Sequence, residues 1–396
     1  MLLSLALIFL CGMILGKIFS LLKLPSLLGL IITGIVLGPY CLNLLDNSIL
    51  SISADLRELA LIIILTRAGL NLDIEDLKKV GRPAILMCFV PASFEIIGMI
   101  LIAPKLFDIS LLDAALMGSV VAAVSPAVLV PKMLKLIDEK YGTNKSIPQL
   151  LMAGASVDDI FVIVLFTSFT SLVKGGNISY LDFVKIPTSI IFGLLLGIII
   201  GFILSKFFTK FHIRDSAKVV IILSISFILV SIETSISNLF GGVIGISGLL
   251  AVMSIGAYLK KSKEELSKRL SLKYSKLWVA AEIILFVLVG AAVNINYAFN
   301  AGVLGIVLIF AVLIFRMLGV LVSLIKTKLN KKERIFSMIA YCPKATVQAA
   351  IGSIPLSLGL ASGEIILVIA VLAILITAPL GAFAIEASYK KLLEHE

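Results

Sequence analysis

The sequence predicts an all-α integral membrane protein with thirteen transmembrane helices. Its 396 residues are 60% apolar and only 15% charged, and the mean hydropathy is +1.15, whereas soluble domains are about 25% charged. Crossing a bilayer takes about 20 consecutive apolar residues. Apolar segments of roughly that length are predicted at residues 2–22, 25–43, 55–72, 83–103, 112–134, 148–173, 186–207, 218–234, 239–260, 276–295, 298–326, 335–358 and 364–388. This composition excludes a soluble globular protein, a disordered chain and a secreted disulfide scaffold.

The basic residues are distributed unequally between the loops. Of the 34 Lys and Arg residues, 27 lie in or beside the odd-numbered loops and the C-terminal tail, and four lie at the even-numbered loops. Cytoplasmic loops of membrane proteins carry such an excess. We therefore expect a cytoplasmic C-terminus, an outer N-terminus and a place in the cell (inner) membrane. The net charge of +10 then reflects cytoplasmic loops beside a lipid bilayer and does not indicate nucleic-acid binding.

Two segments carry a proline in mid-span, Pro126 in the fifth and Pro343 in the twelfth. A shift of 217 residues places Pro126 on Pro343 and Val130 on Val347. Two further matches between the halves of the chain occur at similar shifts. We therefore predict that residues 1–396 form one transmembrane unit with no soluble domain. Segments 1–6 and 8–13 form inverted repeats in it, and segment 7 connects them. Corresponding interrupted helices in two inverted halves indicate a transporter site at the midplane, although proline can also be a simple packing kink.

Seven charged residues lie inside the predicted spans, where an unpaired charge costs several kcal/mol. They are Arg67, Glu95, Asp158, Asp159, Glu282, Arg316 and Lys344. Adjacent residues on a helix point about 100° apart, so one aspartate can hold a fixed cation while the other faces a water-filled pocket. Two dehydrated carboxylates repel each other when both are charged, and oxygen ligands suit small hard cations. Asp159 and Asp158 are therefore the candidate cation and proton ligands, joined by the hydroxyls of Ser156 and Ser125.

The remaining buried charges have supporting roles in this interpretation. Arg316 stays charged under essentially all conditions, so we expect it to pair with Asp158 and compensate its charge. Lys344, beside the second break, either offsets the negative end of a half-helix or releases its own proton. Which of these two basic residues is the main partner of Asp158 stays open. For Glu95 and Glu282 a structural ion pair is at least as reasonable as ion binding.

Three motifs resemble one known family. They are the run from Ala155 to Asp159, the run from Pro343 to Ala350, and the opening from Leu24 to Leu30 with Gly38 and Pro39. Together they are similar to the monovalent cation/proton antiporter superfamily, and the second is most similar to the sodium/proton antiporters of the NHA branch. The resemblance covers nearly the whole chain.

The resemblance implies thirteen spans, a mobile core domain with two crossed broken helices, and a dimerisation domain that forms a homodimer. It implies that Asp159 is the principal cation and proton ligand, with Asp158 as its partner. Arg316 stands where electrogenic relatives carry a lysine paired with the first aspartate. Electroneutral relatives carry an Asn or its equivalent before the Asp, which this chain lacks, so the sequence combines features of both branches.

We therefore expect a secondary transporter that exchanges Na⁺ or Li⁺ for H⁺ by alternating access, with both ions competing for the aspartate pair. No phosphate-binding Gly-x-x-x-x-Gly-Lys-Ser/Thr loop occurs, and we expect neither a cofactor nor enzymatic activity. A K⁺/H⁺ antiporter is the main alternative, and a sodium-coupled organic-solute symporter is a weaker one. An intramembrane aspartyl protease would need two aspartates converging on one water, whereas neighbouring side chains diverge.

Overall fold

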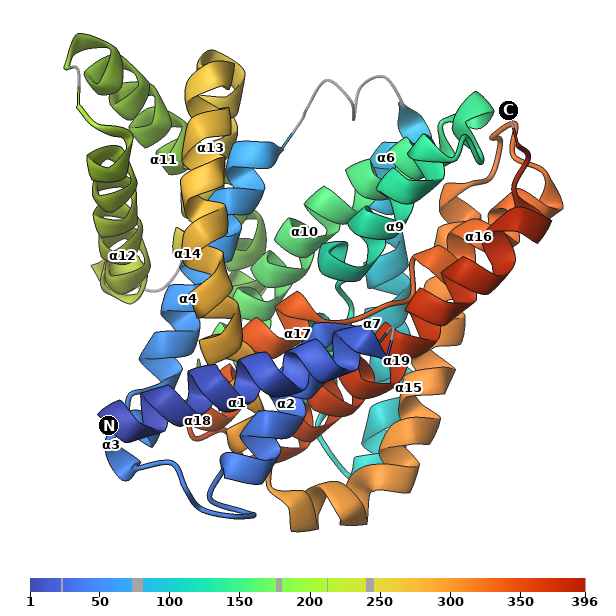
Figure 1. Ribbon diagram of the computed structural model, residues 1–396, viewed down its shortest axis with the longest axis horizontal. Coiled ribbons are helices and arrows are strands. Elements are labelled where there is room, and N and C mark those ends of the chain that lie inside the picture. The colour runs from blue at the N-terminus through green and yellow to red at the C-terminus, as the bar shows by residue number, and fades with distance from the viewer. Residues whose placement is uncertain (23, 73–80, 176–179, 212, 240–245, 396) are drawn as a thin grey trace. The chain divides into compact units, whose positions relative to one another are not determined.

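The structure, a computed structural model, describes residues 1–22, 24–72, 81–175, 180–211, 213–239 and 246–395 (Figure 1). These residues form helices joined by turns, with one isolated antiparallel bridge between Tyr141 and His395. The chain divides into two compact units. The first comprises Met1–Ala54, Glu75–Val162 and Leu285–Glu396, and the second comprises Asp55–Ile74 and Ile163–Ile284.

The first unit contains both helices that are interrupted at proline. Its helices are α1 (Leu2–Leu21), α2 (Ser26–Leu37), α3 (Asn47–Leu50), α6 (Arg82–Met87), α7 (Val90–Phe107), α8 (Leu111–Val121), α9 (Pro126–Asp138), η1 (Thr143–Lys145), α15 (Ile295–Ser323), α16 (Lys331–Ala340), α17 (Thr346–Ile351), α18 (Ile354–Ser357) and α19 (Gly363–Leu392). The long α19 packs against α8, α9, α15, α16, α17 and α18, and α7 packs between α8 and α15. Apolar side chains such as Leu151, Phe336 and Ile385 form a continuous core around these helices.

The second unit is built mainly from α11 (Tyr180–Lys210), α12 (Asp215–Leu239) and α13 (Gly248–Ser262), with α13 packed against the other two. Most of α4 (Ser53–Asn71) also belongs to it. Two long helices, α10 (Ile147–Gly175) and α14 (Glu264–Ala291), run from one unit into the other. The first sixteen residues of α10, which include both candidate aspartates, belong to the first unit.

Over its described residues, each of the thirteen predicted segments coincides with one helix or with a helix that is interrupted once or twice. Within the described residues, nine spans are long and apolar enough to cross a membrane. The other four segments fall short for physical reasons. Helices α2 and α13 have only 12 and 15 residues, α4 carries four charged side chains, and the twelfth segment is divided among α16, α17 and α18. The all-helical membrane architecture is confirmed, and the count of thirteen stays a prediction.

A third interruption, between α6 and α7, was not predicted from the sequence. Pro91, the second residue of α7, has no N–H, so the carbonyl of Met87 four residues earlier has no helical partner. The hydroxyl of Tyr341 donates to that carbonyl at 3.1 Å. A side chain from the twelfth segment thus satisfies a backbone group freed in the fourth, as a break inside a membrane requires.

Three segments far apart in the sequence meet at one end of the first unit. Lys145, after α9, donates to the fully buried carboxylate of Glu333 on α16 at 2.8 Å and to Glu394 in the C-terminal tail at 3.3 Å. The hydrogen bond with Glu333 raises the pKa of Lys145. The backbone N–H of Gly142 also donates to the carbonyl of Glu394 at 2.8 Å. The fifth loop, the eleventh loop and the C-terminal tail therefore lie together. This agrees with the expectation that odd-numbered loops and the tail are on the same side of the membrane.

Glycine allows α2 to approach the last turns of α14 very closely. A Cβ atom at Gly34 would lie 1.9 Å from the carbonyl oxygen of Val287, and one at Gly290 would lie 2.1 Å from that of Ile31. Small residues at such crossings let backbones pack directly in membranes, where van der Waals contact drives helix association.

We therefore predict that Gly34→Ala destabilises the protein by about 1–3 kcal/mol, because the added methyl group must push two backbones apart. The matched control is Gly302→Ala, since a Cβ at Gly302 meets nothing within 4 Å. Thermal unfolding of the detergent-solubilised protein should show a lower midpoint for the first variant only. Equal midpoints would contradict the close approach.

Candidate functional site

Two breaks in transmembrane helices lie against each other in the first unit. Helix α8 ends at Val121 and α9 begins at Pro126, while α16 ends at Ala340 and α17 begins at Thr346. The N–H of Ser125, in the first break, donates to the carbonyl of Pro343, in the second, at 2.8 Å. Pro126 is the first residue of α9, where a missing N–H costs nothing, and Pro343 lies within the extended link. Both prolines therefore stand at helix breaks.

Gln348, on α17, ties the two breaks together. Its side-chain Nε2 donates to the carbonyls of Val121 and Ala123 at 2.9 and 2.8 Å, and its Oε1 accepts from the N–H of Ala345 at 2.9 Å. Gln348 is completely buried. Three backbone groups that a continuous helix would have paired internally are thus satisfied by one amide, which removes the large cost of leaving them bare.

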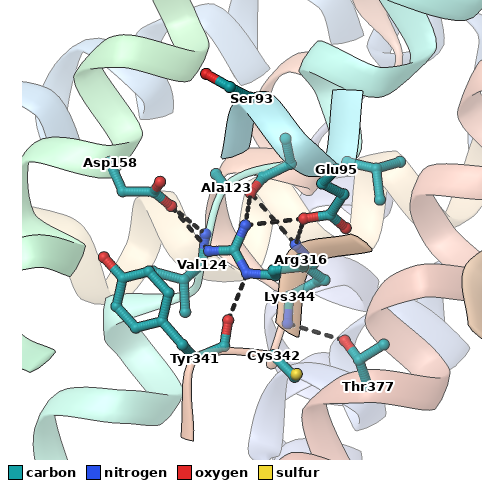
Figure 2. Close-up of polar contacts among 12 residues, drawn as sticks. Ser93, Glu95, Ala123, Val124, Asp158, Arg316, Tyr341, Cys342, Lys344 and Thr377 are labelled. Atoms are coloured by element: carbon teal, nitrogen blue, oxygen red, sulfur yellow. Dashed lines mark hydrogen bonds and ion pairs between the residues drawn. The ribbon is translucent and has the colours of Figure 1, made fainter. Parts of the chain in front are cut away.

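Arg316, on α15, is the hub of a buried ionic cluster (Figure 2). Its Nη1 donates to Glu95 of α7 at 2.8 Å, and its Nη2 donates to Asp158 of α10 at 3.1 Å. The same guanidinium donates to the carbonyls of Ala122 in the first break and Tyr341 in the second. Four separate segments therefore converge on one side chain.

Lys344, in the second break, completes the cluster. Its Nζ donates to Glu95 at 2.6 Å and to the carbonyl of Ala122 at 3.3 Å. Ala122 is four residues before Pro126, so its carbonyl has lost its helical partner, and it lies at the negative C-terminal end of α8. Two cations facing this end offset the partial charge. Lys344 itself is fixed by the bond from its backbone N–H to Thr377 at 2.9 Å.

The cluster balances its own charges. Arg316, Lys344, Glu95 and Asp158 are all 0% exposed, and they supply two positive and two negative charges. A buried ion is tolerated when it is paired and its remaining polar atoms are hydrogen-bonded. Asp159 is the next residue along α10 and brings a third carboxyl group.

Four buried oxygen atoms in or near this cluster have no hydrogen-bond partner among the described residues: Oε1 of Glu95, Oδ1 of Asp158, Oδ1 of Asp159 and Oγ of Ser125. The other oxygen of Asp158 accepts from the N–H of Val124 at 2.7 Å, so Asp158 is held against the first break next to Ser125. Unpaired buried oxygens are rare in folded proteins and are typical of sites that bind water or an ion or that have another functional role. Carboxylate and hydroxyl oxygens such as these are ligands that hard monovalent cations accept.

The structure brings most of the sequence-predicted residues into this site. Arg316 contacts Asp158, whereas Lys344 contacts Glu95 and, within the part of the chain that the structure describes, forms no ion pair with Asp158. Glu282 belongs to the second unit, where Arg67 is near enough to act on its charge. The side chain of Ser156 lies outside the described residues.

Three further residues take part in the site and were not predicted from the sequence: Gln348, Tyr341 and Thr377. The Tyr341 ring lies 5.0 Å from the guanidinium carbon of Arg316, and Gln348 and Thr377 pair backbone groups of the breaks. Their common signal is a polar side chain inside an apolar segment. A polar residue there needs a partner, and only the fold shows which one.

Discontinuous helices that cross at buried charges inside apolar spans are typical of secondary transporters. The sequence pattern of the family "Sodium/hydrogen exchanger, transmembrane" matches residues 5–389. The chain is 32% identical to mouse sodium/hydrogen exchanger 9B2 over 96% of this chain and 71% of that one. It is 30% identical to human sodium/hydrogen exchanger 9B1 over 96% of this chain and 76% of that one.

The fold is also that of a solved antiporter. The sodium proton antiporter MjNhaP1 from Methanocaldococcus jannaschii matches with a TM-score of 0.86 and 21% identity, over 98% of this chain and 97% of that one. The chain belongs to the sodium/hydrogen exchanger family and is a transmembrane cation/proton antiporter. The family membership predicted from the motifs is confirmed.

The pairing within the cluster predicts how single and double substitutions combine. Glu95→Gln removes the carboxylate that both cations share, and breaking a buried pair in this way costs about 3–5 kcal/mol. Adding Lys344→Gln restores the balance of charge and should recover part of that loss. The double-mutant cycle is measured from thermal unfolding midpoints of the four proteins in detergent.

Glu265→Gln serves as the control, because Glu265 is 82% exposed and its ion pair with Lys268 lies at the surface. Such a pair contributes about 0–1 kcal/mol. Additive losses from Glu95→Gln and Lys344→Gln would show that the two side chains are not coupled.

Proposed function

We propose that this protein exchanges Na⁺ or Li⁺ for H⁺ by alternating access, and that the two ions compete for the Asp158–Asp159 pair. Asp159 is the principal ligand in this proposal, because no described side chain neutralises it in the way that Arg316 neutralises Asp158. Ser125 and Ser156 contribute hydroxyl oxygens. Family membership supports antiport of a cation against protons, and the choice of cation and the ligand set are the proposal.

The observation that carries the proposal is that Asp158, Asp159 and Ser125 each have a buried oxygen atom without a hydrogen-bond partner among the described residues. A desolvated carboxylate without a counter-charge favours taking up either a proton or a cation. One carboxylate cannot bind a proton and a metal cation tightly at the same time. Binding of one of these ions therefore releases the other. Exchange follows from this competition without covalent chemistry or a cofactor.

The charges of the site also bear on stoichiometry. With Arg316, Lys344, Glu95, Asp158 and Asp159 all charged, the net charge is −1, which one Na⁺ or one H⁺ neutralises. Arg316 keeps its proton, and Lys344 is held by the Glu95 carboxylate at 2.6 Å. We therefore infer that one proton moves for each cation, through Asp159.

The transport cycle we propose moves a core domain, with its crossed breaks, relative to a dimerisation domain of a homodimer. Segments 1–6 and 8–13 act as inverted repeats, so the two breaks exchange roles as the site opens to either side. The excess of basic residues at the odd-numbered loops supports a cytoplasmic C-terminus, an outer N-terminus and a place in the cell (inner) membrane. The interrupted pairs α8/α9 and α16/α17 support the repeat.

The direct test uses purified protein in liposomes that contain a pH-sensitive dye. After a proton gradient is imposed, Na⁺ or Li⁺ should shift the internal pH, and Asp159→Asn should abolish the response because the competing ligand has lost its charge. Asp108→Asn is the matched control. Asp108 is exposed, lies between α7 and α8, and has the backbone conformation φ 52°, which Asn adopts readily.

The same liposomes separate the alternatives. A response to K⁺ but not to Na⁺ or Li⁺ would favour the K⁺/H⁺ antiporter. Silence with every cation over a range of pH, with choline as the blank, would contradict cation/proton exchange and favour a sodium-coupled symporter. An Asp159→Asn protein as active as the Asp108→Asn protein would remove Asp159 from the mechanism.

The proposed one-for-one exchange predicts a rate that does not depend on membrane potential. Adding valinomycin with equal K⁺ on both sides collapses any potential, and we expect Na⁺-driven proton movement to continue at the same rate. A severalfold acceleration would mean that net charge moves in each cycle. The single-proton account would then be wrong, and Lys344 would become the candidate for a second proton.

A further inference from the structure

The second unit has an open cleft that antiport does not explain. It has a volume of about 480 Å³ and lies on α14, lined by Asp215, Arg269, Leu272, Lys273, Lys276 and Val279 among others. Residues three and four apart share one face of a helix, so the α14 members form a stripe along it. All of the lining residues belong to the second unit.

The cleft lies where α14 passes from a charged sequence into an apolar one. From Glu264 to Lys276 the helix is rich in charges, whereas from Leu277 to Ala291 only Glu282 is charged. Lys276 is therefore at the boundary of the span, where lipid headgroups meet protein. Val279 is 62% exposed on the membrane side of this boundary, and Leu272 is 67% exposed among the basic residues.

The charge of the cleft is not balanced by the protein. Asp215, its acid, is already bound by Arg269 at 2.9 Å and by Lys218 at 3.3 Å. Lys273 and Lys276 are exposed, and neither forms an ion pair with any residue that the structure describes. Two free amines, three residues apart, thus border an apolar surface at the depth of the headgroups.

We propose that this cleft binds an anionic phospholipid, with the headgroup phosphate between the amines of Lys273 and Lys276 and an acyl chain along Val279. Basic side chains at a membrane surface attract anionic lipid, and lysine stems can lie on apolar surface while the amine reaches the headgroup. A soluble anion would use the amines but leave the exposed valine unexplained. The lipid satisfies both parts of the cleft.

The single tryptophan of the chain, Trp278, precedes Val279 on α14, and although it is only 7% exposed, it is close enough in the chain to report on lipid that lies along Val279. The protein is reconstituted in phosphatidylcholine containing phosphatidylglycerol, with bromine on the acyl chains of one lipid or the other. Brominated phosphatidylglycerol should quench Trp278 more strongly than its share of the bilayer predicts. In the variant Lys273→Gln/Lys276→Gln the relative binding constant should fall roughly 30-fold, which corresponds to about 2 kcal/mol for the two lysines together at tenfold per 1.4 kcal/mol.

The matched control is Lys328→Gln/Lys332→Gln, which removes two exposed lysines from the eleventh loop, in the first unit. It should keep the preference for phosphatidylglycerol. Equal quenching by the two brominated lipids in the wild type, or a preference that survives Lys273→Gln/Lys276→Gln, would overturn the proposal.

A second measurement separates a lipid from a soluble anion. Detergent-purified protein is heated with phosphatidylglycerol, phosphatidylcholine or inorganic phosphate, since a ligand that binds only the folded state raises the unfolding midpoint. Only phosphatidylglycerol should raise it, and only while Lys273 and Lys276 are present. Equal stabilisation by inorganic phosphate would identify a soluble-anion site and contradict a lipid site. These outcomes do not depend on which cation is transported.

Discussion

The first unit depends on one buried guanidinium. Arg316 joins α15 to Glu95 on α7, to Asp158 on α10, and to a carbonyl in each of the two helix breaks. In a hydrocarbon environment none of these groups can turn to water, so each needs the others in order to stay buried. The permanent charge of arginine suits this role, because its five donors keep a fixed geometry at any physiological pH.

The two helix breaks and the buried ionic cluster stabilise each other. Prolines open α8/α9 and lie in the link between α16 and α17, and the freed backbone groups are then paired by Gln348, Arg316, Lys344 and Thr377. A continuous helix would offer no carbonyl to the cations, and without the cations the opened ends would be bare. What remains after this pairing is a small set of oxygens near Asp158, which is where a mobile ion can compete with a proton.

The positions of the helices and of the charged site were largely predictable from the sequence, because a lipid bilayer permits few backbone structures and few unpaired charges. Apolar runs located the helices, and charged residues in such runs located the site, since a charge there must be paired or functional. The pairing of Lys344 with Glu95 was not predictable, because depth alone does not distinguish one acid from another. The helix break before Pro91 and the hydrogen bonds by which Gln348 joins the two breaks were not predicted for a related reason. Both depend on a partner that is more than 200 residues away in the chain.

The most direct test of the central claim is an equilibrium measurement of proton release. Purified protein in weakly buffered detergent solution at a pH where Asp159 is protonated is titrated with NaCl or LiCl, with choline chloride as the blank. Competition at one carboxylate predicts about one proton released for each protein saturated with cation, and none from Asp159→Asn. Saturable cation binding without proton release would contradict a shared site.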